Sequence, residues 1–305
     1  MNEFVSHIQT MPIIIHYPIP ADLYKIDTPL EVHIFLDHWD APPPPKQSDA
    51  VRYIYIQCES SGVVDCHHYL RQYGHLYDIV AVFDPVRLGL PNARVGIAGT
   101  GGSWIPPALY TQLDLTKKRF AISSVTGSKL MAPGHHLRHR AYYAQKHYER
   151  FPITFFRSGH SGPMPVVGNN PMLESLGCVP ASGSTKMPLF ETFQFSLVIE
   201  NNKETNYFTE KIIDCVVTKT IPIYWGCPNI GDYFDTTGWI LLGDNIEDSL
   251  YDGLAKLDDG YYQRYIDVVN ANYERAVKIA DPPTLFIEKA TPYIRELERA
   301  ASGNA

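Results

Sequence analysis

Residues 195–229 combine a strand-like run, a polar loop, a helix and a second strand, and the loop carries most of the side chains that could do chemistry. Glu200 and Asn201 directly follow the hydrophobic run 195–199, at the end of a predicted strand. In a doubly wound parallel sheet, ligands bind beyond the carboxyl ends of the strands. We therefore expect Glu200 and Asn201 to lie at a ligand site.

The helix that follows begins with Thr209, Glu210 and Lys211. Because the helix dipole disfavours a cation in the first turn, Lys211 breaks a local rule, and a bound anion would explain it. A diphosphate could be held there by helix N–H groups, by Lys211 and by the hydroxyl of Tyr207. Glu210 has two oxygens that can accept hydrogen bonds from both ribose hydroxyls. The alternative interpretation is a solvated helix start without a ligand.

These residues must be positioned by a larger pattern of alternating strands and helices, which favours a parallel α/β sheet. The predicted strands are 12–17, 31–36, 53–57, 77–83, 120–125, 153–157, 195–199, 221–224 and 239–242. The predicted helices are 64–72, 135–148, 209–217, 261–279 and 283–301, and Pro292 should kink or restart the last of them. Residues 158–188 read as a long irregular segment, either a cover for a binding site or a disordered insertion.

The composition is that of a globular protein, with 305 residues, 45% hydrophobic and 19% charged, which excludes collagen-like, coiled-coil and disordered classes. A net charge of −7 argues against a nucleic-acid partner. We find no signal peptide, no transmembrane segment and no CxxC pair, and therefore expect a soluble cytoplasmic protein with reduced thiols. Cys66, His67 and His68 lack a partner at metal-ligand spacing and are expected on a helix surface.

The same segment resembles the alpha-1,3/1,4-fucosyltransferases, family 10 of the glycosyltransferases, of the soluble bacterial or viral type. Their donor-binding signature is a strand ending in Glu-Asn, a short polar gap, Tyr-x-Thr-Glu-Lys, a helix, and a strand reading x-Pro-(Ile/Val)-x-x-Gly. Here the strand ends in Glu200 and Asn201, residues 207–211 read YFTEK, and residues 221–226 read IPIYWG.

The resemblance implies an α/β protein with the GT-B fold, in which two Rossmann-like domains face a cleft and helices follow at the C-terminus. We expect an acceptor-side domain in residues 1–115, a nucleotide-sugar domain in 116–282, and a C-terminal helix and tail in 283–305. The implied reaction is an inverting transfer of L-fucose from GDP-fucose to a hydroxyl of a glycan acceptor. The expected partners are that donor and acceptor, with no required cofactor and at most stimulation by a divalent metal.

The resemblance also implies roles for individual residues. The family's general base is a Glu at the end of an N-terminal strand, which Glu59 matches, and the alternative is an exposed Glu at a strand end. The family's phosphate-binding Arg matches Arg138, with Arg140 and His136 as close competitors. The resemblance implies that Tyr207 and Lys211 contact the donor phosphates and that Glu210 contacts the ribose. Asn201 and Glu200 would contact the sugar, and Glu200 would also be catalytic. Thr209 would bind the donor, without a more specific role.

Two other functions stay open. The first keeps the fold and mechanism with another donor, such as UDP-xylose or another GDP- or UDP-sugar, because the signature specifies the nucleoside diphosphate better than the sugar. The second is a non-catalytic glycan-binding module. The presence of Glu59 together with Arg138, Glu210 and Lys211 argues against it, because such a module has no use for a diphosphate site. No Asp-x-Asp motif is convincing; the nearest approach, residues 37–40, is interpreted as a loop. The acceptor and the oligomeric state cannot be predicted.

Overall fold

The computed structural model describes residues 13–16, 26–99, 101–127, 129–144, 153–158, 173–176 and 186–303. The chain divides into two compact units, one made of Met1–Thr100 with Pro283–Ala305 and the other of Gly101–Pro282. Each unit is built on its own parallel sheet. Among the described residues, no helix is both long and apolar enough to cross a membrane.

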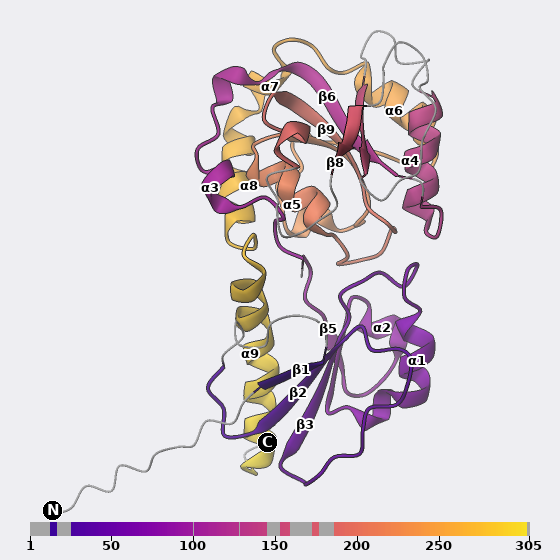
Figure 1. Ribbon diagram of the computed structural model, residues 1–305, viewed down its shortest axis with the longest axis vertical. Helices are drawn as coiled ribbons and strands as arrows, with labels where there is room; N and C mark the ends of the chain where they lie inside the picture. The colour runs from indigo at the N-terminus through magenta and orange to yellow at the C-terminus, as the bar shows by residue number, and fades with distance from the viewer. Residues whose placement is uncertain are drawn as a thin grey trace, which may run out of the picture. The chain divides into compact units, whose positions relative to one another are not determined.

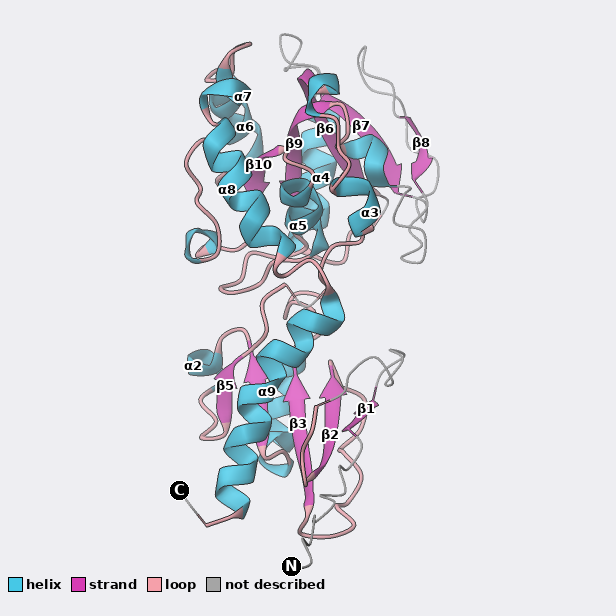
Figure 2. Ribbon diagram, turned by 90° about the vertical axis from the view of Figure 1, so that its left-hand side faces the viewer, coloured by secondary structure: helices cyan, strands magenta, loops and turns pink. Residues whose placement is uncertain are grey.

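The first unit is a five-stranded parallel sheet with helices on both faces (Figures 1 and 2). Its strands follow the order β1 (Ile13–His16), β2 (Glu31–Leu36), β3 (Val51–Ile56), β4 (Ile79–Val82) and β5 (Ala93–Val95). Helices α1 (Cys66–Tyr73) and α2 (Pro85–Leu88) cover one face, and α9 (Pro282–Ala301) runs along the other. A short 3-10 turn, η2 (Gly74–Leu76), follows α1.

Strands of this sheet are apolar over most of their length, since a parallel sheet covered on both faces exposes neither side. Ile54 and Ile56 on β3 and Val80 on β4 are fully buried. Between the sheet and α1 lies an aromatic cluster that includes Tyr55 and Tyr69, and the Tyr69 and Tyr77 hydroxyls are 2.7 Å apart. This packing fixes the carboxyl ends of β2 and β3, where polar residues follow.

The second unit is a six-stranded parallel sheet with the order β11-β10-β9-β6-β7-β8. Its strands are β6 (Arg119–Thr126), β7 (Ile153–Ser158), β8 (Leu173–Leu176), β9 (Phe193–Ile199), β10 (Ile221–Trp225) and β11 (Ile240–Leu241). Helices α4 (Pro133–Ala144) and α6 (Ile246–Leu254) lie on one face, and α5 (Glu210–Val217) and α8 (Ile266–Val277) on the other (Figure 1). The remaining short helices are α3 (Pro107–Tyr110), η3 (Leu115–Lys117), η6 (Ile230–Asp232) and α7 (Tyr261–Arg264).

The strand order of this sheet reverses between β6 and β9. From β6 the chain proceeds through β7 to β8 on one side, and it then returns to place β9, β10 and β11 on the other. Such a reversal is the point at which open α/β sheets bind ligands, outside the carboxyl ends of the two strands. The helices that follow these two strands are α4 and α5, so their first turns border that point.

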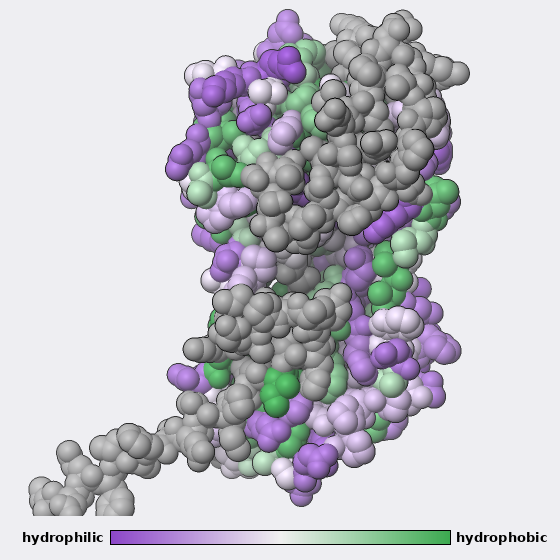
Figure 3. All heavy atoms as spheres, viewed as in Figure 1, coloured by the Kyte–Doolittle hydropathy of each residue, from purple (hydrophilic) through white to green (hydrophobic). Residues whose placement is uncertain are grey.

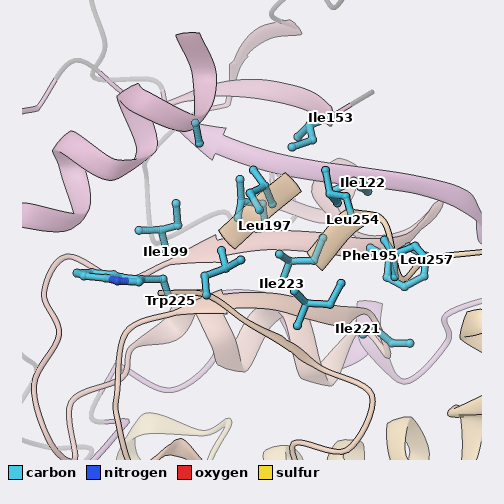
Figure 4. Packing of buried hydrophobic residues seen from close by; sticks show 14 of the residues in the cluster. Ile122, Ile153, Phe195, Leu197, Ile199, Ile221, Ile223, Trp225, Leu254 and Leu257 are labelled. Atoms are coloured by element: carbon cyan, nitrogen blue, oxygen red, sulfur yellow. The ribbon is translucent and has the colours of Figure 1, made fainter. Parts of the chain in front are cut away.

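The core beneath this point is aliphatic and aromatic (Figure 4). Ile122 of β6 is in register with Phe195 of β9, and Leu197 of β9 with Ile223 of β10. All four side chains are buried. A packed core of this kind holds the strand ends rigidly, which a ligand site at those ends requires.

The structure differs from three local predictions of the sequence analysis. Helix α9 continues through Pro292 and does not restart there, because Pro292 and Glu288, whose carbonyl loses its N–H partner, are both exposed. Residues 158–188 contain strand β8, although most of that segment and residues 145–148 lie outside the described residues. Cys66 and His67 are buried rather than on a helix surface, because the start of α1 packs onto the aromatic cluster.

Candidate functional site

The start of α4 approaches the end of β9 unusually closely. The Gly134 N–H donates to the Asn201 carbonyl at 2.9 Å. A Cβ atom added at Gly134 would lie 1.7 Å from the Glu200 carbonyl oxygen, a distance that no side chain tolerates. Glycine at this position therefore lets α4 deliver its polar residues to the carboxyl edge of the sheet.

Arg138 lies one turn further along α4 and is buried. Its Nη1 donates to the Ile199 carbonyl at 2.6 Å, and its Nη2 donates to Asn201 Oδ1 at 3.0 Å. The structure thus brings Arg138 and Asn201 together at the end of β9. The competing residue Arg140 instead forms an ion pair with Glu247 of α6, in an outer groove that His136 also lines.

His135, which the sequence analysis did not single out, lies at a point where several positively charged side chains are close together. Burial, together with the charges of Arg138, Lys129 and Lys211, lowers its pKa to about 4. The Ala132 N–H donates to His135 Nδ1 at 3.1 Å, so the neutral ring carries its proton on Nε2. A neutral donor surrounded by cations suits an anionic ligand. The basic run of residues 135–140 was the available sequence signal.

Glu200 is fully buried and holds the start of α5. Its Oε1 accepts from the Thr209 N–H at 3.0 Å, and its Oε2 accepts from the Thr209 hydroxyl at 2.7 Å. Burial raises the pKa of Glu200, and the positive charge of Lys211 opposes this. These are the contacts of a residue that positions Thr209, and its predicted catalytic role stays a prediction.

The first turn of α5 carries Lys211, the cation that the sequence analysis singled out. Thr209 caps the helix, and Lys211 Nζ donates to Thr209 Oγ1 at 3.1 Å and to Glu210 Oε1 at 3.2 Å. Burial tends to raise the pKa of Glu210, but the charges of Lys211 and Lys186 outweigh it and hold that pKa at about 2. Glu210 is therefore an ionised acceptor at neutral pH, beside an ammonium group at a helix N-terminus.

A second lysine, Lys186, completes this charge network and was missed from the sequence. Its Nζ lies 2.8 Å from Asp214 Oδ2, 3.7 Å from Glu210 Oε1 and 4.1 Å from the centre of the Trp104 ring. Asp214 is fully buried and also accepts from the Ser103 hydroxyl, at 2.8 Å. The spacing of Glu210 and Asp214, four residues apart on one helix, was a signal for a shared partner, but no sequence spacing indicated Lys186.

Tyr207 and Glu59 differ from the cluster in their surroundings. Tyr207 is fully buried, between the end of β9 and α5 in the chain, so its predicted phosphate contact stays a prediction. Glu59 follows β3 in the first unit and is partly exposed, at the carboxyl edge of that unit's sheet. Its carboxylate Oε1 accepts from the Ser60 N–H at 3.1 Å.

No group of three or more metal-ligating side chains is present in the part of the chain that the structure describes. On the face drawn in Figure 3, hydrophilic and hydrophobic residues are interspersed over the described surface. The site is identified instead by its charges and hydrogen bonds.

Comparison with solved structures defines the fold as GT-B, as the sequence analysis predicted. The alpha,alpha-trehalose 6-phosphate synthase of Burkholderia multivorans has a TM-score of 0.55 and 11% identity, over 90% of this chain and 73% of that one. TarM has a TM-score of 0.52 and 11% identity, over 87% and 54%. An alpha1,3-fucosyltransferase with GDP has a TM-score of 0.44 and 14% identity, over 82% and 79%.

Within this class, the sequence is fucosyltransferase-like. It is 28% identical over 126 residues to the alpha-(1,3)-fucosyltransferase FucT of Helicobacter pylori. The match covers 41% of this chain and only 25% of that relative's length. No family model matches the chain. The predicted resemblance to fucosyltransferases is confirmed.

Proposed function

We propose that this protein is an inverting glycosyltransferase that moves L-fucose from GDP-fucose to a hydroxyl of a glycan acceptor. The observation that carries the proposal is the charge cluster at the reversal between β6 and β9, where Arg138, Lys211 and the N-terminus of α5 meet. Its support from sequence is the partial match to a fucosyltransferase of Helicobacter pylori.

The diphosphate of the donor would bind where the positive charges gather around His135. Lys211 and Arg138 would neutralise the phosphate oxygens, and the helix N-terminus adds backbone donors and a favourable dipole. Thr209 and Tyr207 are proposed to add hydroxyl contacts. Binding would require Arg138 to share its present bonds to Ile199 and Asn201 with the phosphate.

The carboxylates around these cations would orient the rest of the donor. Glu210, ionised with a pKa of about 2, can accept from both ribose hydroxyls over the whole physiological pH range. Asn201, at the carboxyl end of β9, is proposed to contact the sugar. Glu200, whose two oxygens are occupied by Thr209, would act mainly by fixing the start of α5.

In the proposed reaction, Glu59 takes the proton of the acceptor hydroxyl as that oxygen attacks the anomeric carbon. The bond from this carbon to the diphosphate breaks, and GDP leaves with the electron pair, which inverts the anomeric configuration. Arg138 and Lys211 stabilise the departing charge, so the mechanism requires no metal, and a divalent ion would at most stimulate it. The acceptor would bind on the unit that contains Glu59.

The substitution Glu59→Gln tests this mechanism. We expect it to lower kcat by about 10²- to 10⁴-fold, because it removes the general base, and to leave GDP affinity unchanged. Transfer is measured by mass spectrometry of the glycan product, and GDP affinity by calorimetry. Glu31→Gln, at the opposite end of the neighbouring strand β2, is the matched control and should keep wild-type turnover. Normal transfer by Glu59→Gln would reject the assignment.

A further inference from the structure

We propose that Asp37 is a positioning residue that, together with Gln57, fixes the backbone of Glu59 for proton abstraction. The inference rests on the proposed function, because it takes Glu59 as the base. It gives a role to the loop after β2, which the sequence analysis interpreted only as a connection. Neither the resemblance nor the comparisons provide this role.

The carboxylate of Asp37 bridges from the end of β2 to the turn after β3. Its Oδ1 accepts from the Cys58 N–H at 2.8 Å, and its Oδ2 accepts from the Glu59 N–H at 2.9 Å. The Asp37 N–H continues the ladder by donating to the Ile56 carbonyl at 3.0 Å. Asp37 therefore fixes the direction in which the chain leaves β3.

Gln57 holds the same turn from the opposite side. Its side chain is fully buried, its Nε2 donates to the Glu59 carbonyl at 3.0 Å, and its Oε1 accepts from the Phe83 N–H at 3.1 Å. Both backbone polar groups of Glu59 are thus bound by side chains: Asp37 comes from the end of β2, and Gln57 is itself bonded to the residue after β4. A reacting group needs this kind of fixed placement, because small displacements are costly in rate.

The backbone of Asp37 also departs from the usual pattern. Its φ is +44°, in the left-handed region that non-glycine residues rarely occupy. Such strain persists when surrounding contacts compensate for it, and it is concentrated at functional sites. Here the compensation comes from the bonds that Asp37 makes to the turn carrying Glu59.

The ionisation state of Asp37 should control this arrangement. Burial and, to a smaller extent, the negative charge of Glu59 raise the pKa of Asp37 to about 6, although the hydrogen bonds from the Cys58 and Glu59 N–H groups oppose this increase. The other titratable groups near it are Tyr55 of β3, whose pKa burial raises so that it stays neutral, the thiol of Cys58, whose N–H it binds, and His38, the next residue in the chain. Protonation of Asp37 weakens its acceptance from the Cys58 and Glu59 N–H groups.

The test is a pH–rate profile of wild type and Asp37→Asn between about pH 5 and 8. We expect wild-type kcat to fall as the pH is lowered through about 6, where Asp37 becomes protonated. In Asp37→Asn, kcat should be roughly 10- to 100-fold lower at neutral pH and should lack that step, because the amide does not ionise and presents a donor toward one N–H. The Kd for GDP should not change.

Stability distinguishes this role from a structural one. Because the pKa of Asp37 in the folded protein lies above its ordinary value of 3.8, its contribution to the free energy of unfolding decreases as pH rises from 3.8 to about 6. Its effects on rate and on stability therefore change in opposite directions with pH. Loss of activity at low pH that simply followed thermal unfolding would contradict the proposal.

Matched variants keep the test decisive. Asp84→Asn alters a similar aspartate after β4 that caps α2 through the Arg87 N–H at 3.0 Å, and it should preserve both kcat and the pH step. Gln57→Leu should lower kcat but retain the step near pH 6. If Asp37→Asn does not fold, a wild-type profile without that step still overturns the inference, as does a folded Asp37→Asn with the wild-type profile.

Failure of this inference and failure of the proposed function look different. If the wild-type protein transfers no sugar from any GDP-sugar, the proposed function is wrong. If the wild type is active and Glu59→Gln is inactive, while Asp37→Asn keeps the wild-type rate and profile, only the role of Asp37 is wrong.

Discussion

Lys211 is placed against the helix dipole, and its neighbours show how that placement is stabilised. Its ammonium group lies 3.2 Å from Glu210 Oε1 and 3.8 Å from Glu200 Oε2. These two carboxylates offset the unfavourable dipole, so the lysine is held near the helix start before any ligand arrives. A diphosphate would join an already ordered charge network, which lowers the entropic cost of binding.

The substitution Lys211→Met should therefore weaken GDP binding selectively. Loss of a hydrogen bond to a charged group predicts about 10- to 100-fold higher Kd for GDP. The Kd for guanosine, which lacks the phosphates, should change little. Calorimetry with both ligands measures this difference. Lys203→Met, which removes an exposed lysine paired with Asp244, is the control and should bind GDP normally. Equal losses for GDP and guanosine would contradict the phosphate role.

At the scale of elements, the site depends on how closely α4 approaches the end of β9. The hydrogen bond from Gly134 to Asn201 and the two bonds from Arg138 join the helix to the strand end. These contacts place His135 and Arg138 beside the first turn of α5. The site is thus made by two helix starts that converge where the strand order reverses.

Gly134→Ala should disturb this convergence. The added Cβ would meet the Glu200 carbonyl oxygen at 1.7 Å, so α4 must shift, at a cost of about 1–3 kcal/mol in the free energy of unfolding. We expect a lower Tm and weaker GDP binding, measured by calorimetry. Gly231→Ala is the control, since a Cβ there has no neighbour within 4 Å. Unchanged GDP binding by Gly134→Ala would show that the close approach is not required.

Much of this arrangement was predictable from the sequence, because hydrophobic runs and a contiguous motif carry it. Strand β9, the start of α5 and strand β10 lie within one stretch, and the positions of Glu200 and Lys211 follow from it. Contacts between distant segments were not predictable. Lys186 reaches Asp214 across 28 positions, and Asp37 reaches Cys58 across 21, without any local pattern that indicates either partner.

Burial was also difficult to predict for polar residues. Lys118 lies in the basic run of residues 117–119 before β6, and lysines are rarely buried. Here it is buried, and its ammonium group donates to the Phe190 and Phe193 carbonyls and to Thr220. Its role depends on the order of β6, β9 and β10 in the sheet, which hydrophobic periodicity does not specify.

At the scale of the whole molecule, Lys118 should make stability depend on pH. Burial lowers its pKa from 10.5 to about 7, so between these values the unfolded chain binds more protons than the folded one. Its contribution to the free energy of unfolding should therefore increase as pH rises from about 7 to 10.5. Urea unfolding at several pH values measures this increase.

Lys118→Met should flatten the increase, because the titrating group is gone. Lys117→Met is the matched control, since Lys117 is exposed next to it and should leave the pH dependence unchanged. An increase in stability with pH that persisted in Lys118→Met would assign the effect to other groups.

The protein has a net charge of −7, but its charges are unevenly distributed among the described residues. An acidic chain attracts few anions overall, but Arg138, Lys129 and Lys211 gather where two helix starts meet. A local group of cations of this kind suits one small anion, as we propose for the diphosphate.

A donor screen tests the central claim most directly. Wild-type protein is titrated by calorimetry with GDP-fucose, GDP-mannose, UDP-xylose and UDP-glucose, and GDP release is followed for each donor. We predict binding and turnover of GDP-fucose, with weaker or no response to the UDP-sugars. A folded protein that binds no GDP-sugar would contradict the account, and a response to a UDP-sugar alone would keep the glycosyltransferase mechanism but reject GDP-fucose as the donor.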